Sequence, residues 1–171
     1  MASIEGNARA NRLTGTGVAD DIEGKGGNDV LFGLGGHDIL DGDLGRDTIF
    51  GGTGNDSIEG GGGNDVIFGG FGNDLISGDE GNDTMNGGAG RDTFVFDTGD
   101  GDDRINGFIA GTSIADRLDL RDAAFDFVTL ADVLARAVDT AAGVKIDLGA
   151  GDSVVLAGVR EAKLAANDFI L

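Results

Sequence analysis

The stretch Gly51-Gly52-Thr53-Gly54-Asn55-Asp56-Ser57-Ile58-Glu59 is one copy of a nine-residue unit that decides the fold of this chain. The unit recurs nine times without a gap over residues 15–95, and a worn copy with Asn11 in the acidic position precedes it at residues 6–14. In every full copy the first residue is Gly, the sixth is Asp and the eighth is apolar. The eighth-position residues are Ile22, Leu31, Leu40, Ile49, Ile58, Ile67, Ile76, Met85 and Phe94.

The unit predicts a short strand followed by a turn. One apolar residue between two outward-facing residues fits a three-residue strand, because side chains alternate between the faces of a strand. The six Gly- and Asx-rich residues before it fit a turn, since Gly adopts positive φ and Asp and Asn tolerate such turns. Turns and strands at a fixed period give two parallel sheets that face each other, with one coil every eighteen residues. We therefore predict an all-β solenoid whose core is the set of eighth-position side chains.

The predicted core is thin, and the acidic positions stack. One buried apolar side chain in nine residues leaves little hydrophobic surface to stabilise the fold. The nine Asp residues add like-charge repulsion, and the whole chain has a net charge of −19. Carboxylates that converge with turn carbonyls form a cage of hard oxygen ligands, which suits Ca²⁺. The pattern therefore predicts calcium sites in the turns.

The candidate metal-binding residues are the sixth-position carboxylates and the glycines at the first and fourth positions. The carboxylates are those of Asp20, Asp29, Asp38, Asp47, Asp56, Asp65, Asp74, Asp83 and Asp92. The first-position glycines are Gly24, Gly33, Gly42, Gly51, Gly60, Gly69, Gly78 and Gly87, and the fourth-position glycines are Gly27, Gly36, Gly45, Gly54, Gly63, Gly72, Gly81 and Gly90. After the repeat, Asp100, Asp102 and Asp103 are candidates for one further ion, with a solvated acidic turn as the alternative.

These units closely resemble the nonapeptide of the RTX (repeats-in-toxin, haemolysin-type calcium-binding) proteins, most clearly at residues 51–59, 60–68 and 69–77. The resemblance implies a parallel β-roll with Ca²⁺ held between turns that stack on the same edge, two units apart. Five turns on each edge then leave four gaps, so we expect about seven ions and at most eight in the roll. The gap beside Asn11 is expected to be weak or empty.

The second and fourth positions of some units depart from the repeat pattern. Val18 replaces the Gly at the fourth position of the first full unit. A side chain at a position of positive φ is strained, so the first full turn is the one least certain to follow the pattern. The residues that replace Gly at the second position are Thr16, Lys25, Leu34, Asp43 and Asp79.

Residues 96–171 have an ordinary globular composition and are predicted to cap the end of the roll. Leu118 and Leu120 alternate with charged residues as in a strand. Thr129 with Asp132 predicts a helix cap, and the apolar residues of 130–138 fall on one helical face. Residues 144–156 alternate around a Gly-rich turn and predict a hairpin.

The C-terminal segment also resembles that of RTX proteins such as the serralysin-type proteases and the epimerase R-modules. The matching stretches are residues 116–120, 147–154 and 167–171. The ending Asp168-Phe169-Ile170-Leu171 resembles an uncleaved C-terminal signal, which implies export by a type I secretion machinery to the extracellular space. A final edge strand is the structural alternative for these four residues.

Phe32, Phe50 and Phe68 occupy the ninth position at intervals of eighteen residues. They are predicted to stack on the outside of one sheet, where an exposed apolar strip often marks a contact surface. We expect this strip to pack on the C-terminal segment or on a partner chain, as in a homo-oligomer. The alternative is that Phe favours the strand through cross-strand packing alone. The other sheet carries a polar ladder of Glu23, Asp41, Glu59 and Ser77.

Composition excludes several classes of function. The acidic surface argues against a nucleic-acid partner, and no stretch is long and apolar enough to insert into a membrane. Residues 1–5 contain no secretory leader and continue the repeat register, so we expect the chain to be a fragment of something longer. His37 is the only His and is expected to be a solvent-facing turn residue. The chain has no Cys either, so the residues that nucleophilic catalysis requires are not expected here.

The leading hypothesis from sequence is a non-enzymatic module that folds on calcium after secretion and assists an attached N-terminal domain or parent protein. Its expected domains are the roll of residues 1–95 and the C-terminal cap of residues 96–171. The alternative is an extracellular binding module for a polysaccharide, a surface layer or another copy of the chain. An unfolded Gly-rich linker is disfavoured because a linker has no use for an apolar residue in fixed phase, and no acidic loop has the spacing of an EF-hand.

Overall fold

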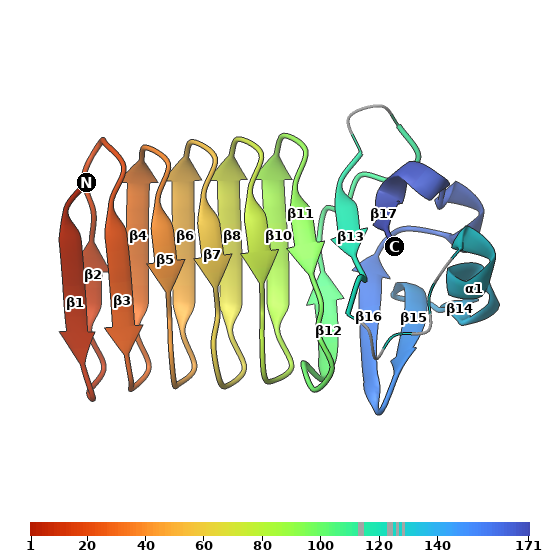
Figure 1. Ribbon diagram of the computed structural model, residues 1–171, viewed down its shortest axis with the longest axis horizontal. Coiled ribbons are helices and arrows are strands. Elements are labelled where there is room, and N and C mark those ends of the chain that lie inside the picture. Colours follow the sequence, from red (N-terminus) through yellow and green to blue (C-terminus); the bar gives the residue numbers. More distant parts are fainter. Residues whose placement is uncertain (113–114, 123–124, 126, 128) are drawn as a thin grey trace.

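The computed structural model describes residues 1–112, 115–122, 125, 127 and 129–171, and two sheets run along its length (Figure 1). Neighbouring strands of the repeat are parallel in both sheets. The eight-stranded sheet consists, in spatial order, of β1 (Ser3–Asn7), β3 (Asp21–Lys25), β5 (Ile39–Asp41), β7 (Ser57–Glu59), β9 (Leu75–Ser77), β11 (Thr93–Val95), β13 (Arg117–Asp119) and β17 (Phe169–Ile170).

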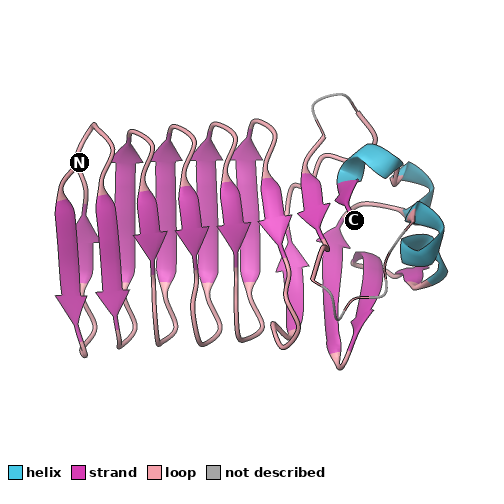
Figure 2. Cartoon of the chain, in the orientation of Figure 1, coloured by secondary structure: helices cyan, strands magenta, loops and turns pink. Residues whose placement is uncertain are grey.

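The nine-stranded sheet lies opposite and includes an antiparallel extension at the C-terminal end. Its strands, in spatial order, are β14 (Ala137–Asp139), β15 (Gly143–Gly149), β16 (Asp152–Ala157), β12 (Asp102–Ile105), β10 (Thr84–Ala89), β8 (Val66–Phe71), β6 (Thr48–Thr53), β4 (Val30–Gly35) and β2 (Arg12–Thr14). The helical segments α1 (Leu130–Ala135), η1 (Glu161–Lys163) and η2 (Ala166–Asp168) lie at the C-terminal end of the roll (Figure 2).

The eighteen-residue coil is confirmed by the strand register. Leu40 is the Cα partner of Ile22 on one side and of Ile58 on the other, and the opposite sheet pairs its own eighth-position residues in the same way. All nine eighth-position side chains are 0–1% exposed and form one cluster between the sheets. Leu13 of the worn unit is only partly buried. The predicted fold class and core are therefore confirmed.

The strands of the nine-stranded sheet are longer than the unit predicts. β4, β6, β8 and β10 contain six residues each instead of three. The added residues are the first three of the following turn, which keep pairing from coil to coil, as Gly52 does with Gly70. On the opposite edge, Lys25 pairs with Asn7 at the ends of β3 and β1, and other equivalent turn residues make isolated bridges, such as Gly26 with Leu44.

The second position of the turn has positive φ even where it is not Gly. Lys25, Leu34, Asp43 and Asp79 have φ values between 60° and 76°, a region that is costly for a residue with a Cβ. Thr16 is different, because it is described in the structure and does not have positive φ. The backbone is therefore strained at four of the five substituted second positions. Neither Thr16 nor Val18 has positive φ, so the first full turn departs from the pattern, as expected.

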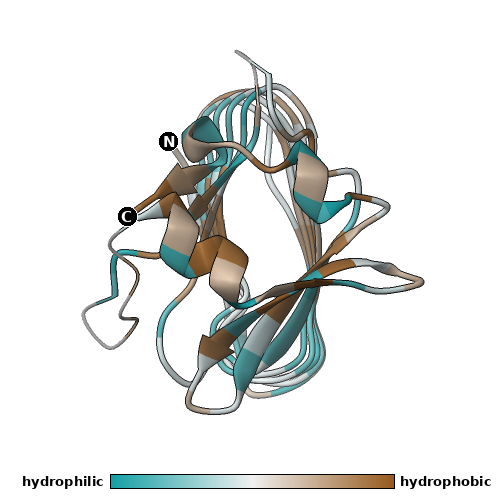
Figure 3. Cartoon of the chain, turned by 90° about the vertical axis from the view of Figure 1, so that its right-hand side faces the viewer, coloured by the Kyte–Doolittle hydropathy of each residue, from teal (hydrophilic) through white to brown (hydrophobic). Residues whose placement is uncertain are grey.

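The C-terminal segment continues both sheets and covers the end of the core. β12 and β16 extend the nine-stranded sheet beside β10, whereas β13 and β17 extend the other beside β11. Viewed along the axis of the roll, these elements and the helices lie across its C-terminal end (Figure 3). The buried residues Phe96, Ile105 and Leu118 join the repeat core to the apolar residues of this segment.

One element of the C-terminal segment was predicted wrongly. The Thr129–Asp132 capping box is present at the start of α1, but the helix ends at Ala135 and does not include residues 137 and 138. Those residues form β14, whose backbone pairs with β15, and Val138 is 63% exposed. The pairing with the predicted hairpin of β15 and β16 overrides the helical periodicity.

Replacing Ile58 by Ala should destabilise the calcium-saturated protein by about 2–5 kcal/mol, because the side chain is 1% exposed and leaves a cavity between the sheets. Ile39→Ala is the matched control, since this side chain is 47% exposed on the outer face of the same sheet; it should cost less than about 0.5 kcal/mol. Denaturant unfolding of both variants measures the difference. Equal losses would show that the space between the sheets is not the core.

Candidate metal centre

Two rows of aspartates follow the two edges where the chain turns between the sheets. One row contains Asp29, Asp47, Asp65 and Asp83, and the other contains Asp20, Asp38, Asp56, Asp74 and Asp92, with eighteen residues between neighbours. Each carboxylate is linked to the turn before it, because Oδ1 accepts a backbone N–H from the residue eighteen positions earlier, which is Ala2 for Asp20, Asn11 for Asp29 and an aspartate for the others. The N–H of Asp29 donates to Asp47 at 2.6 Å, and that of Asp56 donates to Asp74 at 3.0 Å.

The second carboxylate oxygen of eight aspartates has no hydrogen-bond partner. These Oδ2 atoms are buried and belong to Asp29, Asp38, Asp47, Asp56, Asp65, Asp74, Asp83 and Asp92. A buried and unpaired carboxylate oxygen is strongly destabilising unless a cation or a donor compensates it. Eight such atoms at the same place in eight repeats therefore mark places where something positive fits.

Each unpaired oxygen faces the gap between its own turn and the next turn of the row. A methyl group built on Gly24 would lie 2.6 Å from Oδ2 of Asp29 and 2.7 Å from the carbonyl oxygen of Gly42, which belongs to the next turn. The same construction on Gly60 finds Asp65 Oδ2 at 2.8 Å and the Gly78 carbonyl at 2.6 Å. First-position Gly is thus required because a side chain there would collide with two oxygens.

Fourth-position glycines also contribute to the stacking of oxygens. The place of a Cβ on Gly54 is taken by the carbonyl oxygen of Gly36, and the same holds for Gly72 with Gly54 and for Gly90 with Gly72. Within the described residues, no three or more His, Cys, Asp or Glu side chains converge on a common metal position. An ion in these gaps would therefore take many of its ligands from backbone carbonyls, which suits the hard, flexible coordination of Ca²⁺.

Burial disfavours the charged form of the carboxylates in the chain without metal. Desolvation raises the pKa of Asp47, Asp65, Asp74 and Asp92 to about 6 and that of Asp83 to about 7. The ordinary pKa of Asp is about 3.9. The fold thus holds these groups where their negative charge is costly, and a bound cation would remove that cost.

Both rows continue beyond the repeat. Asp103 accepts the N–H of Asp83 at 2.8 Å, and desolvation raises the pKa of Asp103 to about 8. On the other edge, Asp116 accepts the N–H of Asp92 at 3.0 Å through Oδ1 and that of Ile109 at 2.8 Å through Oδ2. Sequence analysis missed Asp116 because it follows Asp92 by 24 residues instead of eighteen. The sequence does contain a signal for Asp116, because Leu118 follows it by two positions, as the apolar residue follows the Asp in each repeat unit.

The other two acidic candidates after the repeat occupy different environments. Asp100 is buried, its Oδ2 accepts the N–H of Asp97 at 2.7 Å, and desolvation raises its pKa to about 6. Asp102 lies on the outer side of β12, where it accepts a hydrogen bond from Ser153 and lies 3.5 Å from the ammonium of Lys145. Asp103 and Asp100 are thus buried near the end of the row, whereas Asp102 is not.

A second ladder, which the sequence analysis did not anticipate, lies outside the aspartate rows at the fifth position of the unit. The side-chain oxygen of Asn55 accepts the N–H of Asn73 at 2.9 Å, and Asn64 accepts that of Asn82 at 3.1 Å. His37 takes the same place, since its Nδ1 accepts the N–H of Asn55 at 2.7 Å. His37 is exposed as predicted, but it also connects two turns.

The aromatic strip is present on the outer face of the nine-stranded sheet. Phe32 and Phe50 stack at 5.0 Å between ring centroids, and Phe50 and Phe68 stack at 5.1 Å. The guanidinium of Arg12 covers the Phe32 ring at 4.1 Å. Phe32 and Phe50 are half-buried, and Phe68 is 39% exposed. The predicted stacking is confirmed, and contact of the strip with a partner chain stays a prediction.

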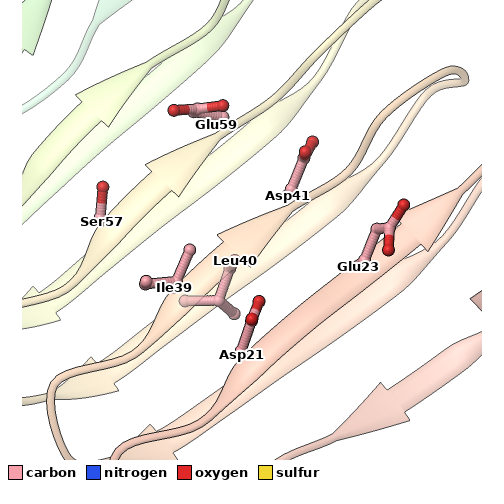
Figure 4. Close-up of a pocket in the computed structure, with 7 residues that line it drawn as sticks. All are labelled: Asp21, Glu23, Ile39, Leu40, Asp41, Ser57 and Glu59. Atoms are coloured by element: carbon pink, nitrogen blue, oxygen red, sulfur yellow. The ribbon is translucent and has the colours of Figure 1, made fainter. Parts of the chain in front are cut away.

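The outer face of the eight-stranded sheet is acidic. Asp21, Glu23, Asp41 and Glu59 project from β3, β5 and β7 around a shallow pocket (Figure 4). Desolvation, with the neighbouring carboxylates, raises the pKa of Asp41 and of Glu59. This face has no unpaired buried carboxylate oxygen of the kind found in the rows, as far as the described residues extend.

No described helix is long and apolar enough to cross a bilayer. A comparison with curated proteins found no match. Among solved structures, the crystal structure of the extracellular lipase LipA from Serratia marcescens matches with a TM-score of 0.49 and 16% identity. That match covers 99% of this chain and 40% of the lipase chain, so this chain spans less than half the length of that protein.

The family comparison matches residues 14–49, 41–76 and 60–94 to the model of the RTX calcium-binding nonapeptide repeat (4 copies). The matched residues are those whose turns carry the aspartate rows and whose strands form the two parallel sheets. Residues 14–94 are therefore RTX calcium-binding nonapeptide repeats, folded as a β-roll.

Proposed function

We propose that this chain is a calcium-dependent folding module that is secreted and supports the export and folding of a protein to which it is attached. The observation that carries the proposal is the set of eight buried and unpaired Oδ2 atoms, four on each edge of the roll. RTX repeats bind Ca²⁺, and proteins that contain them are typically secreted. The proposal adds which gaps hold the ions and what the ions do for this chain.

The proposed sites are the eight gaps that an unpaired Oδ2 faces. Six are bordered by two repeat aspartates, and two are closed by residues beyond the repeat. The ligands would be the carboxylates on both sides together with turn carbonyls of the first- and fourth-position glycines. The gaps lie between Asp29 and Asp47, Asp47 and Asp65, Asp65 and Asp83, Asp83 and Asp103, Asp38 and Asp56, Asp56 and Asp74, Asp74 and Asp92, and Asp92 and Asp116.

Bound calcium would supply the charge that the roll lacks. Eight divalent ions would reduce the net charge from −19 to about −3, which lowers the self-repulsion that favours an expanded chain. Each site saturated a hundredfold adds about 2.7 kcal/mol to the stability of the folded state. Extracellular calcium modules need affinities of only about 10⁻⁴–10⁻³ M. The chain would therefore stay unfolded in a cytosol with little calcium and fold outside the cell.

The C-terminal segment supports a division of labour in which residues 1–95 bind calcium and residues 96–171 both cap the roll and carry the export signal. Phe169 and Ile170 pair with β13 as the last strand of the eight-stranded sheet. Asp168 is fully buried, and its two carboxylate oxygens accept the N–H groups of Gly111 and Ala165, both at 2.8 Å. The type I secretion machinery would have to read this signal before the chain folds.

We propose no catalytic activity for this chain. His37 is the only His and is bound to the neighbouring turn. The buried carboxylates of the two rows already link neighbouring turns and border the proposed calcium gaps. Catalysis would instead belong to an attached domain.

Asp65→Asn should remove at least one calcium ion, because the substituted side chain borders two of the proposed gaps and its amide cannot replace a carboxylate in both. The matched control is Asp41→Asn, which makes the same change of charge on the outer face and should leave the stoichiometry unchanged. Native mass spectrometry in calcium gives both counts. Equal losses in the two variants would place the ions outside the rows.

The pH dependence of stability should reverse when calcium is bound. Without metal, the raised pKa of Asp65 (about 6) and of Asp83 (about 7) means that the folded state binds more protons than the unfolded state. The metal-free fold should then gain stability as the pH falls from 8 to 5.5. With calcium, protons compete with the ions and stability should fall over the same range. Far-ultraviolet circular dichroism at both pH values measures the folded fraction of the metal-free chain, and melting temperatures measure the stability of the calcium-loaded chain. The same direction of change with and without calcium would contradict the prediction.

Export should depend on the C-terminal segment and not on the roll alone. In cells with a type I secretion machinery, a reporter fused before residue 1 of the whole chain should reach the medium. A fusion that ends after residue 167 and lacks the last four residues should remain inside. Cell fractionation followed by blotting distinguishes the two locations. Equal secretion of both fusions would remove the export signal from the proposal.

A further inference from the structure

The first full turn of the roll differs from the later turns on its edge. At the second position of those turns, Leu34 has φ of 74°, Gly52 of 109°, Gly70 of 112° and Gly88 of 97°. Thr16 stands at the same place in the first turn without positive φ. Thr16 therefore has a different backbone conformation from its counterparts.

This difference gives Asp20 donors that the other aspartates lack. The N–H and the hydroxyl of Thr16 both donate to Oδ2 of Asp20, at 2.6 and 2.7 Å, and Oδ1 accepts the N–H of Ala2 at 2.9 Å. Both oxygens of this buried carboxylate are thus hydrogen-bonded within the chain. The other eight repeat aspartates each keep an unpaired Oδ2.

The carbonyl oxygens of the first turn are also out of place. In the later turns a fourth-position carbonyl points at the Cα of the next fourth-position Gly, as that of Gly36 does toward Gly54. Gly36 itself instead faces the carbonyl carbon of Val18 and the nitrogen of Ala19. The peptide between Val18 and Ala19 is therefore rotated relative to its counterparts, and the Val18 carbonyl oxygen lies 3.3 Å from the hydroxyl of Thr16.

The turn of the worn unit, on the other edge, also has an internal hydrogen bond from its second position to its sixth. The N–H of Asn7, at its second position, donates to Oδ1 of Asn11 at 2.7 Å. Gly27 in the next turn faces the backbone of Arg9 and Ala10, whereas Gly45 faces the carbonyl oxygen of Gly27. Each edge therefore begins with a turn that is closed by its own hydrogen bonds.

We propose that the gap between Asp20 and Asp38 is a latent calcium site, which Thr16 and Val18 keep closed. The first turn on each edge is then a metal-free cap, and the calcium array begins at Asp29 and Asp38. The inference rests on the proposed function, because it concerns which gaps of the same array take an ion. It also identifies Thr16 as the residue that replaces a cation with two hydrogen bonds.

The direct test converts the first turn to the sequence of a later one with the double variant Thr16→Gly/Val18→Gly. This variant frees Oδ2 of Asp20 and permits positive φ at both positions, so native mass spectrometry in saturating calcium should find one ion more than in the unaltered chain. Leu34→Gly is the matched control, since position 34 already has positive φ, and its count should stay unchanged. A folded double variant with no added ion would overturn the proposal.

A second pair of variants decides the matter even if the double variant fails to fold. Asp20→Asn should leave the number of bound ions unchanged, because the Asp20 carboxylate holds no ion if the gap is closed, whereas Asp38→Asn should lose at least one ion. Loss of an ion from Asp20→Asn would show that the gap is occupied in the unaltered chain. If the unaltered chain bound no calcium at all, the proposed function itself would fail, which is a separate outcome.

Discussion

The structure depends on the different roles of the two carboxylate oxygens of each repeat aspartate. Oδ1 accepts a backbone N–H from the preceding turn and sets the distance between coils, as in the 2.7 Å bond from Asp47 to Asp65. Oδ2 is left buried and unpaired in eight of the repeats. Oδ1 therefore holds neighbouring coils together, whereas the buried and unpaired Oδ2 destabilises the stacked coils until a cation binds. In the proposed function, this conflict couples folding to calcium.

The rest of the repeat follows from the same arrangement. First-position Gly is needed because a side chain would collide with the unpaired oxygen and the next carbonyl, as at Gly24. The eighth-position side chains fill the space between two sheets that lie close together, so each coil contributes only two buried apolar residues. Such a core gives limited hydrophobic stabilisation. Under the proposed function, the module would remain unfolded for export and become stable outside, because much of its folding free energy would come from the ions.

The nine-residue period was sufficient to predict the two sheets, the core and the stacked Phe rings, since each depends only on spacing. Three features were not predicted, because each depends on contacts that the nine-residue period does not fix. Asp116 joins a row across an irregular insertion of the chain, and residues 137–139 pair with a hairpin instead of extending the helix. Thr16 adopts a different backbone conformation because its N–H and hydroxyl can both bond to Asp20. Calcium ligation was inferred from residue type, whereas the unpaired oxygens became visible only in three dimensions.

The most direct test of calcium-coupled folding is a far-ultraviolet circular dichroism titration of chelator-treated protein with Ca²⁺, using Mg²⁺ as the control cation. Calcium-coupled folding predicts a steep transition from coil to β-sheet with Ca²⁺ and little response to Mg²⁺, which prefers a stricter octahedral geometry. A metal-free protein that already showed the full β-sheet spectrum at neutral pH would contradict it, because the buried unpaired carboxylates would then not need a cation.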